Sequence, residues 1–149
     1  MKKSILITAL FSLLFISAQS QILKPIKWSY AAKKTGANTA TIFIKATIDQ
    51  GWHLYSQFVK DGGPVKTTFS FKPSKEYSLV GKTLEPKAII KYEDTFKMDV
   101  KYFEHSVIFQ QKIKTNGKTA MVKGTVESMV CNDKQCLPPE EVSFNVAVK

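Results

Sequence analysis

The sequence predicts an all-β protein, an antiparallel β-sandwich, from three observations. Apolar and polar residues alternate over most of the chain, and no stretch of about ten residues has helical apolar spacing. Turn signals recur about every 8–12 residues, as they do in sandwiches. The chain has 149 residues, 44% of them hydrophobic, which is enough for one domain and too few for two.

Residues 39–49 show the clearest alternation, with Ile42 and Ile44 on one face and Thr41 and Lys45 on the other. Asn116-Gly117 lies between two alternating runs and predicts a β-hairpin. Further strands are expected at residues 52–58, 65–71, 88–92, 99–103, 106–113, 119–130 and 142–148. Residues 21–38, with the polar stretch 33–38, are expected to be a loosely held first strand and its loop, which gives about eight or nine strands.

The start of the chain is predicted to be a secretory signal peptide, residues 1–20. Two lysines precede the apolar run 5–16, and small residues stand before a cut at Gln21. An apolar run of about a dozen residues is too short to span a bilayer; an uncleaved N-terminal anchor is the alternative. We therefore expect residues 21–149 to be a single exported domain, secreted or periplasmic, that does not span the membrane.

The formal net charge is +10, from 22 basic and 12 acidic residues, and every basic residue is lysine. Specific recognition of nucleic acids and phosphates favours the bidentate fork of arginine, so we expect no nucleic-acid partner. Dispersed lysines usually form a solvated surface, although they can also steer acidic partners toward a protein.

Cys131 and Cys136 are the sharpest chemical signal in the sequence. Four polar residues separate them and make a loop that can fold back into a disulfide, while Pro138 and Pro139 stiffen its exit. Closing a ring of about six residues stabilises a fold by only roughly 2 kcal/mol, which suits a bond that opens and closes. The spacing alone leaves two interpretations open, a structural disulfide and a redox pair.

No metal or cofactor is expected. His53 and His105 lie on different predicted strands without paired ligand spacing, and Met98, Met121 and Met129 are more typical of a core than of a copper site. A Ser-His-Asp hydrolase is also disfavoured, because the sequence has no nucleophile elbow.

Three segments, in order, resemble the N-terminal periplasmic domain of the thiol:disulfide interchange protein DsbD. The first is Gly51-Trp52-His53-Leu54-Tyr55, which follows an alternating strand and a turn. The second is Tyr92-Glu93-Asp94-Thr95-Phe96, and the third is the cysteine pair with the prolines and glutamate that follow it. Together with the strands around them they span about residues 40–148, which is most of residues 21–149.

The resemblance implies an immunoglobulin-like sandwich with its dithiol in an edge loop. In that family the domain receives electrons from a membrane-embedded partner through a thioredoxin-like domain, and passes them to periplasmic thioredoxin-fold proteins. Carried over to this sequence, Cys136 would form the mixed disulfide and Cys131 would resolve it.

The resemblance also implies that Phe96 caps the sulfurs, with Tyr55 and His53 lining the site and Asp94 close by. An aromatic cap on a movable loop fits the chemistry, because exchange needs a thiolate that a partner reaches and stray oxidants do not. The plainer alternatives are ordinary packing for the three rings and a turn position for Asp94.

The sequence departs from the family pattern in three places. Four residues separate the cysteines where the best-known members have five, Leu137 replaces an aromatic residue, and His53 replaces a tyrosine. The chain ends at Lys149, so we expect a detached thiol-disulfide oxidoreductase module served by a separate membrane electron donor. The alternative is a secreted binding or adhesion sandwich whose disulfide is only structural.

Overall fold

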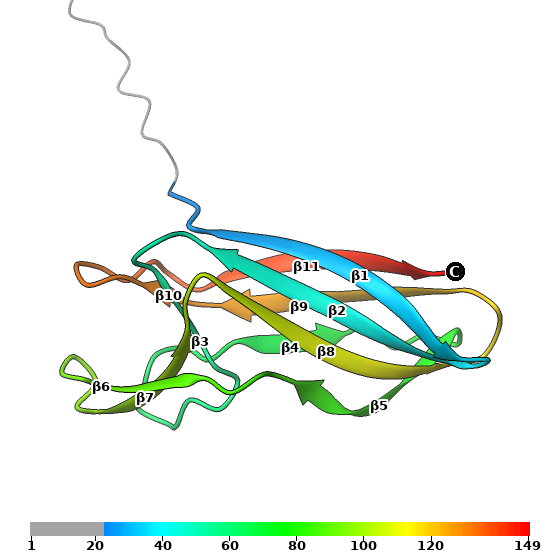
Figure 1. Cartoon of the computed structure of the whole chain (residues 1–149), viewed down its shortest axis with the longest axis horizontal. Helices are drawn as coiled ribbons and strands as arrows, with labels where there is room; N and C mark the ends of the chain where they lie inside the picture. The colour runs from blue at the N-terminus through cyan, green and yellow to red at the C-terminus, as the bar shows by residue number, and fades with distance from the viewer. Residues whose placement is uncertain (1–22) are drawn as a thin grey trace, which may run out of the picture.

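The computed structural model describes residues 23–149 and folds them into a sandwich of antiparallel sheets (Figure 1). The predicted all-β, immunoglobulin-like sandwich is confirmed, whereas the predicted signal peptide lies outside the described residues. No helix of residues 23–149 is long and apolar enough to cross a membrane. The strands are β1 (Ile26–Gly36), β2 (Thr39–Ile48), β3 (His53–Tyr55), β4 (Thr68–Phe71), β5 (Tyr77–Leu84), β6 (Ile89–Glu93), β7 (Met98–Phe103), β8 (Ser106–Thr115), β9 (Ala120–Ser128), β10 (Val130–Cys131) and β11 (Glu140–Val148).

Two sheets enclose the main core. One has the strand order β1-β2-β8-β5, and the other has the order β11-β9-β4. Ile44 and Phe109 of the first sheet share one buried cluster with Val122 and Phe144 of the second. Across the two sheets, the ring of Phe69 on β4 lies 4.9 Å from the ring of Phe109. Removing these apolar surfaces from water supplies the main driving force for the sandwich.

A third sheet, with the order β10-β3-β7-β6, extends one end of the sandwich (Figure 1). Successive side chains on a strand point to opposite faces, so this small sheet has two buried faces of different kinds. One face joins the main core through Leu54, Phe103 and Val130. The other face forms a second, smaller cluster of Tyr55, Val100, Tyr102 and Cys131.

The first strand is longer than the sequence predicts, and it pairs with β2 along its whole length. β1 includes residues 33–36, which were expected to be loop, and pairs with β2 from Ile26↔Ile48 to Gly36↔Thr39. Its inner positions alternate through Trp28 and Tyr30, but the pattern is lost in the sequence at apolar Ala31 on the outer side and at the four exposed residues 33–36, which include Lys33 and Lys34. Such lysines are typical of an edge strand, where they discourage pairing with another chain.

The hairpin predicted at Asn116-Gly117 is wrong, because this turn joins strands of different sheets. β8 pairs with β2 and β5, whereas β9 pairs with β11 and β4. The backbone N–H groups of Thr115 and Asn116 donate to Asn38 and Glu76, which belong to other loops at this end. The local sequence therefore specifies a turn, while the packing of the two sheets determines that the next strand, β9, pairs with β11 and β4 and not with β8.

Two further strands differ from the prediction. β5 was missed because a bulge between Val80 and Leu84 interrupts its alternation, with Gly81 at a φ of 70° that favours glycine. β3 ends at Tyr55 rather than at residue 58. Directly after it, the Ser56 hydroxyl and the Gln57 N–H both donate to the Glu85 carboxylate, which draws the chain out of the sheet.

Candidate functional site

The two cysteines form a disulfide within a short hairpin that follows β9. Cys131 and Cys136 are partners in an antiparallel bridge, with Cα atoms 4.0 Å apart. On the inner side of this pair, the Leu137 N–H donates to the Val130 carbonyl at 2.9 Å. The cysteines thus occupy a non-hydrogen-bonded position of the ladder, where cross-strand side chains approach each other most closely.

The outer side of the hairpin is closed by Asn132. Its N–H donates to the Gln135 carbonyl at 2.9 Å, and its Oδ1 accepts the N–H groups of Lys134 and Gln135 at 2.9 and 2.8 Å. Asparagine side chains stabilise turns in this way. The four residues between the cysteines therefore give a tight turn that places the two sulfur atoms in register.

The two cysteines differ sharply in their exposure to solvent. Cys131 is only 4% exposed and belongs to the second buried cluster. Cys136 is itself exposed and lies between exposed Gln135 and half-buried Leu137. A partner protein can thus approach Cys136, whereas Cys131 is covered by the fold.

β3 places His53 beside the disulfide. His53 is the register partner of Cys131, so their side chains share one face of the small sheet. The His53 ring lies 4.4 Å from the Tyr102 ring, and its Nε2 is 3.1 Å from a Glu104 carboxylate oxygen. This packing and this contact hold the imidazole against the sheet.

Two tyrosines form the buried floor next to the cysteines. Tyr55 and Tyr102 are register partners on β3 and β7 and are 3% and 5% exposed. Burial, helped by the negative charge of Glu93, raises the pKa of Tyr55 to about 12. Burial likewise raises the pKa of Tyr102, with a smaller contribution from Glu104. Both phenols are therefore neutral at physiological pH.

The β6–β7 hairpin brings Phe96 over this floor. The Phe96 N–H donates to the Glu93 carbonyl at 3.1 Å, and Lys97 completes the turn with a φ of 52°. The half-buried Phe96 ring packs against the cluster that contains Cys131. Asp94 is exposed in the same turn.

A hollow of about 270 Å³ lies between the two hairpins and is lined by all six residues predicted for the site. These residues are Cys131, Cys136, His53, Tyr55, Phe96 and Asp94. Segments that are about 80 residues apart in the sequence thus meet at one end of the molecule. The acidic side chains of Glu93, Asp94 and Asp133 and the ammonium of Lys91 also line this hollow.

Three residues of the site were not predicted from the sequence. Tyr102 and Val100 complete the floor, and Glu104 contacts His53. The alternation of Val100 and Tyr102 is visible in the sequence, but only the pairing of β3 with β7 shows which face they share with the cysteines. Nothing in the sequence connects Glu104 with His53, because these residues are brought together solely by strand pairing.

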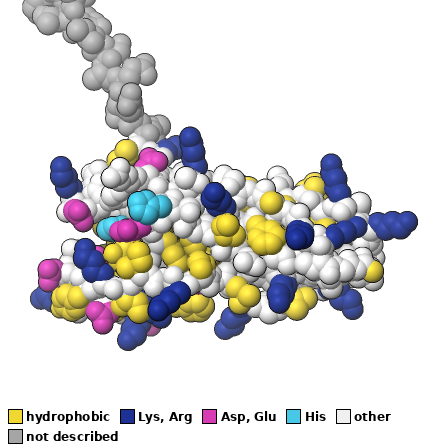
Figure 2. Space-filling model, viewed as in Figure 1, with side chains coloured by type: hydrophobic (Ala, Val, Ile, Leu, Met, Phe, Trp, Pro, Cys, Tyr) yellow, Lys and Arg dark blue, Asp and Glu magenta, His cyan; other side chains and the backbone are white. Residues whose placement is uncertain are grey.

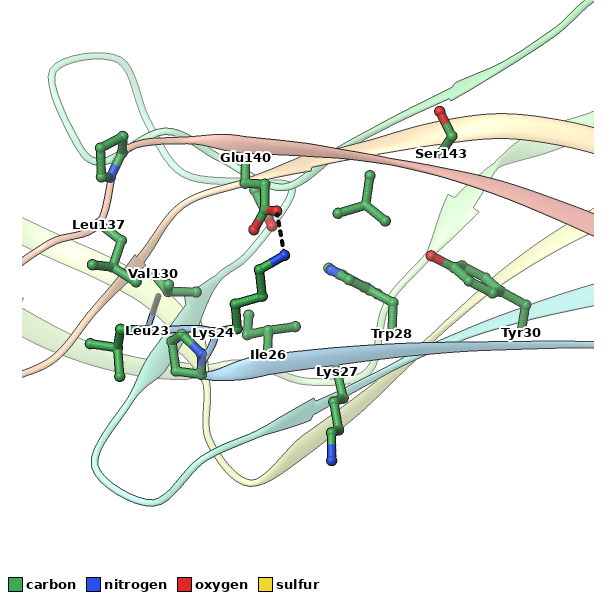
Figure 3. A pocket seen from close by; sticks show the side chains of 14 residues that line it. Leu23, Lys24, Ile26, Lys27, Trp28, Tyr30, Val130, Leu137, Glu140 and Ser143 are labelled. Carbon is green, nitrogen blue, oxygen red and sulfur yellow. Dashed lines mark ion pairs between the residues drawn. The ribbon is translucent and has the colours of Figure 1, made fainter. Parts of the chain in front are cut away.

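A second hollow, of about 340 Å³, lies between β1 and β11 and contains none of the predicted site residues (Figure 3). Trp28 and Tyr30 point into it from β1, and the Lys24–Glu140 ion pair, at 3.8 Å, crosses its mouth (Figure 3). The Tyr30 hydroxyl is buried there without a hydrogen-bond partner among the described residues. In residues 23–149, no group of three or more His, Cys, Asp or Glu side chains is placed to hold a metal ion.

The chain was compared with known families and solved structures. A family model described as "Thiol:disulfide interchange protein DsbD, N-terminal" matches residues 19–148. The DsbD N-terminal domain of Neisseria meningitidis in its reduced form is similar, with a TM-score of 0.57 and 15% identity over 85% of this chain and 90% of that one. The comparison with curated proteins returned no match.

Two further solved structures have the same fold. The N-terminal periplasmic domain of ScsB from Proteus mirabilis gives a TM-score of 0.62 at 16% identity, over 83% of this chain and 46% of that one. A complex between the DsbD and PilB N-terminal domains of Neisseria meningitidis gives a TM-score of 0.55 at 14% identity, over 85% of this chain and 88% of the matched one. At these identities the similarity establishes the fold.

Proposed function

The chain belongs to the family of DsbD N-terminal domains and is a thiol-disulfide exchange module with one cysteine pair; we propose that it carries two electrons between thioredoxin-fold proteins. The observation that supports this most directly is the pairing of an exposed Cys136 with a buried Cys131 in one disulfide. The sulfur of Cys136 is accessible to a partner, and the sulfur of Cys131 is bonded to it and buried.

In the first half of the proposed cycle the disulfide is reduced. A thiolate of the donor attacks Sγ of Cys136, the bond between the two cysteines breaks, and Cys131 leaves as a thiolate. The second thiol of the donor, as its thiolate, then attacks the donor sulfur of the mixed disulfide and releases Cys136. The donor is oxidised to a disulfide, and this chain gains two electrons and, after protonation, two protons.

In the second half the dithiol reduces an acceptor. The Cys136 thiolate attacks the disulfide of the acceptor and forms a mixed disulfide, and one acceptor sulfur leaves as a thiolate. Cys131 then attacks Sγ of Cys136, which restores the disulfide and releases the acceptor as a dithiol. The 4.0 Å separation of the two Cα atoms keeps Cys131 within reach for this step.

We assign the surrounding side chains to protection and positioning. Phe96 covers the buried side of the pair, around Cys131, and shields it from small oxidants while Cys136 stays accessible to a partner. His53 and Tyr55 keep the floor packed, and Asp94 lies at the rim of the hollow. The site requires no cofactor for this chemistry, because the partners supply and accept the electrons.

We further propose that the domain works outside the cytoplasm, after cleavage before Gln21. A periplasmic or secreted location allows disulfides to form and persist. The two proposed partners are a membrane electron donor, as a separate protein, and soluble thioredoxin-fold acceptors.

The redox equilibrium of the exported chain tests this function. The protein is equilibrated in graded glutathione buffers, and its free thiols are counted by alkylation and mass spectrometry. A potential near or above about −230 mV is expected, in the range of exchange catalysts. A bond that stays oxidised below about −300 mV would instead indicate a structural disulfide and would favour the alternative, a secreted binding or adhesion sandwich.

Two cysteine variants test the assigned roles. Cys131→Ala should accumulate a mixed disulfide through Cys136 with a thioredoxin-fold partner, because the resolving thiol is missing. Cys136→Ala is the matched control and should form no such adduct. Transfer at the native rate by both variants would rule out the proposed mechanism.

A further inference from the structure

The charges of this protein are segregated along its long axis. On the face shown in Figure 2, the acidic side chains gather toward the end that carries the two histidines, and the opposite end displays lysines without acidic neighbours. The histidine-bearing end contains the disulfide, with Glu93, Asp94, Glu104 and Asp133 close to it. Within residues 23–149, the excess of lysines over acidic side chains is therefore greatest away from the redox site.

The opposite end is built from three turns and the C-terminus. Lys34 Nζ donates to the Lys118 carbonyl at 2.7 Å, which joins the β1–β2 turn to the β8–β9 turn. The Asn116 side chain donates to the Lys75 carbonyl at 2.7 Å, which joins the β8–β9 turn to the β4–β5 loop. The exposed lysines of this basic end are Lys33, Lys34, Lys72, Lys75, Lys114, Lys118 and Lys149.

Among the described residues of these turns, Glu76 is the one acidic side chain, and its carboxylate already accepts the Met121 N–H at 2.7 Å. Met121 itself is 40% exposed beside these lysines. The basic end thus combines a concentrated positive charge with a flexible apolar side chain.

We propose that the basic end binds the anionic headgroups of a phospholipid membrane. Lysines attract an anionic bilayer additively and over a broad, flat area. Arginine, which recognises individual phosphates bidentately, is absent from the chain. The lysines come from four separate segments that meet at this end, so their attraction to a laterally mobile array of headgroup charges adds up. Exposed Met121 fits the boundary between headgroups and acyl chains.

This orientation keeps the disulfide free for partners. β9 runs from Ala120 at the basic end to Ser128 near the cysteine hairpin, and about 3.3 Å per residue makes that roughly 25 Å. A membrane-bound chain therefore holds Cys136 roughly this far above the surface. The inference rests on the charge distribution alone and does not require the proposed electron transfer.

Co-sedimentation of the exported chain with vesicles tests the proposal. Binding is expected to phosphatidylcholine vesicles containing phosphatidylglycerol and not to pure phosphatidylcholine, and it should weaken steeply with salt. The triple variant Lys33→Gln, Lys75→Gln, Lys114→Gln should bind at least tenfold more weakly. Within residues 23–149 these three side chains make no ion pair or hydrogen bond, so the fold is expected to be unchanged; circular dichroism checks this.

The matched control removes the same charge elsewhere, at Lys27, Lys60 and Lys87, each changed to Gln. It should retain binding within about threefold, because these exposed lysines lie outside the basic end. Equal losses in both triple variants would show attraction by net charge alone and would overturn the proposal. Absence of binding to anionic vesicles would also overturn it, as would binding to polyglutamate without vesicle binding, which would indicate an acidic protein partner instead.

Discussion

Cys131 and Cys136 face each other in one ladder position with Cα atoms 4.0 Å apart, yet Cys131 is 4% exposed and Cys136 lies in an exposed strand. A hairpin makes this possible because one of its strands, β10, pairs with β3, while the segment that contains Cys136 bridges only Cys131 among residues 23–149. The hydrogen bonds of the ladder already hold the two strands together, so the disulfide adds little to their alignment.

Reduction of the disulfide should therefore cost the fold little. The bond closes a ring of about six residues, for which the loss of chain entropy in the unfolded state corresponds to about 2 kcal/mol. Urea unfolding of the oxidised protein and of the Cys131→Ala, Cys136→Ala double variant measures this difference. A loss above about 4 kcal/mol would contradict the interpretation of the bond as an exchangeable pair and would favour a structural one.

Phe96→Ala should make the cysteine pair more reactive without unfolding the protein. The ring packs against the cluster that contains Cys131, so its removal opens a path for small oxidants and alkylating agents. We expect the reduced protein to react with iodoacetamide several-fold faster. Because Phe96 is only half-buried, the free energy of unfolding should fall by less than the roughly 3–5 kcal/mol typical of a core phenylalanine.

Ile90→Ala is the matched control for this experiment. Ile90 belongs to the same β6–β7 hairpin but is 59% exposed and lies outside both the hollow and the cluster around Cys131. Its removal should leave the alkylation rate of the thiols unchanged. If both variants accelerated alkylation equally, the effect would come from loosening of the hairpin and not from the loss of a cap.

Sequence patterns predict most of the sandwich because one face of each long strand is buried. Ile42, Ile44 and Ala46 alternate cleanly along β2, and the same period identifies β8, β9 and β11. β5 could not be predicted in this way, since its bulge at Gly81 interrupts the alternation. Strand pairing could not be predicted either. Asn116-Gly117 is a turn, but the packing of whole sheets determines that β9 does not pair with β8.

The site, like the fold, has residues that the sequence predicts and residues that only strand pairing reveals. The cysteines stand out in the sequence itself, whereas Phe96, Tyr55, His53 and Asp94 were identified by resemblance to a family. The structure places all six around one hollow. Tyr102 and Glu104 depend on strand register, which links positions about 50 residues apart and leaves no local trace in the sequence. The roles assigned to these side chains stay predictions until variants are measured.

Alkaline pH should destabilise the protein partly through Tyr55. Its pKa is raised from 10.0 to about 12 by burial, so the folded state keeps a proton that the unfolded chain releases above pH 10. Stability is therefore unaffected by this group below pH 10 and falls as the pH rises from 10 to 12. Urea unfolding from pH 9 to 12 should show a shallower loss for Tyr55→Phe than for the native chain. The exposed Tyr92→Phe is the control and should follow the native slope; identical slopes for all three proteins would contradict the prediction.

Tyr30→Phe should leave stability unchanged or raise it by up to about 1 kcal/mol, since a buried hydroxyl without a partner carries an uncompensated desolvation cost. The Tyr30 hydroxyl has no hydrogen-bond partner among the described residues, whereas its ring stacks on Phe144 at 5.2 Å and this stack survives the substitution. Tyr77→Phe is the matched control: its hydroxyl donates to the Lys72 carbonyl at 2.6 Å, and its loss should cost about 1 kcal/mol. The urea midpoints of the two variants test this prediction. An equal loss of unfolding free energy in both variants would contradict it, because it would mean that water in the hollow between β1 and β11 forms a hydrogen bond with the Tyr30 hydroxyl.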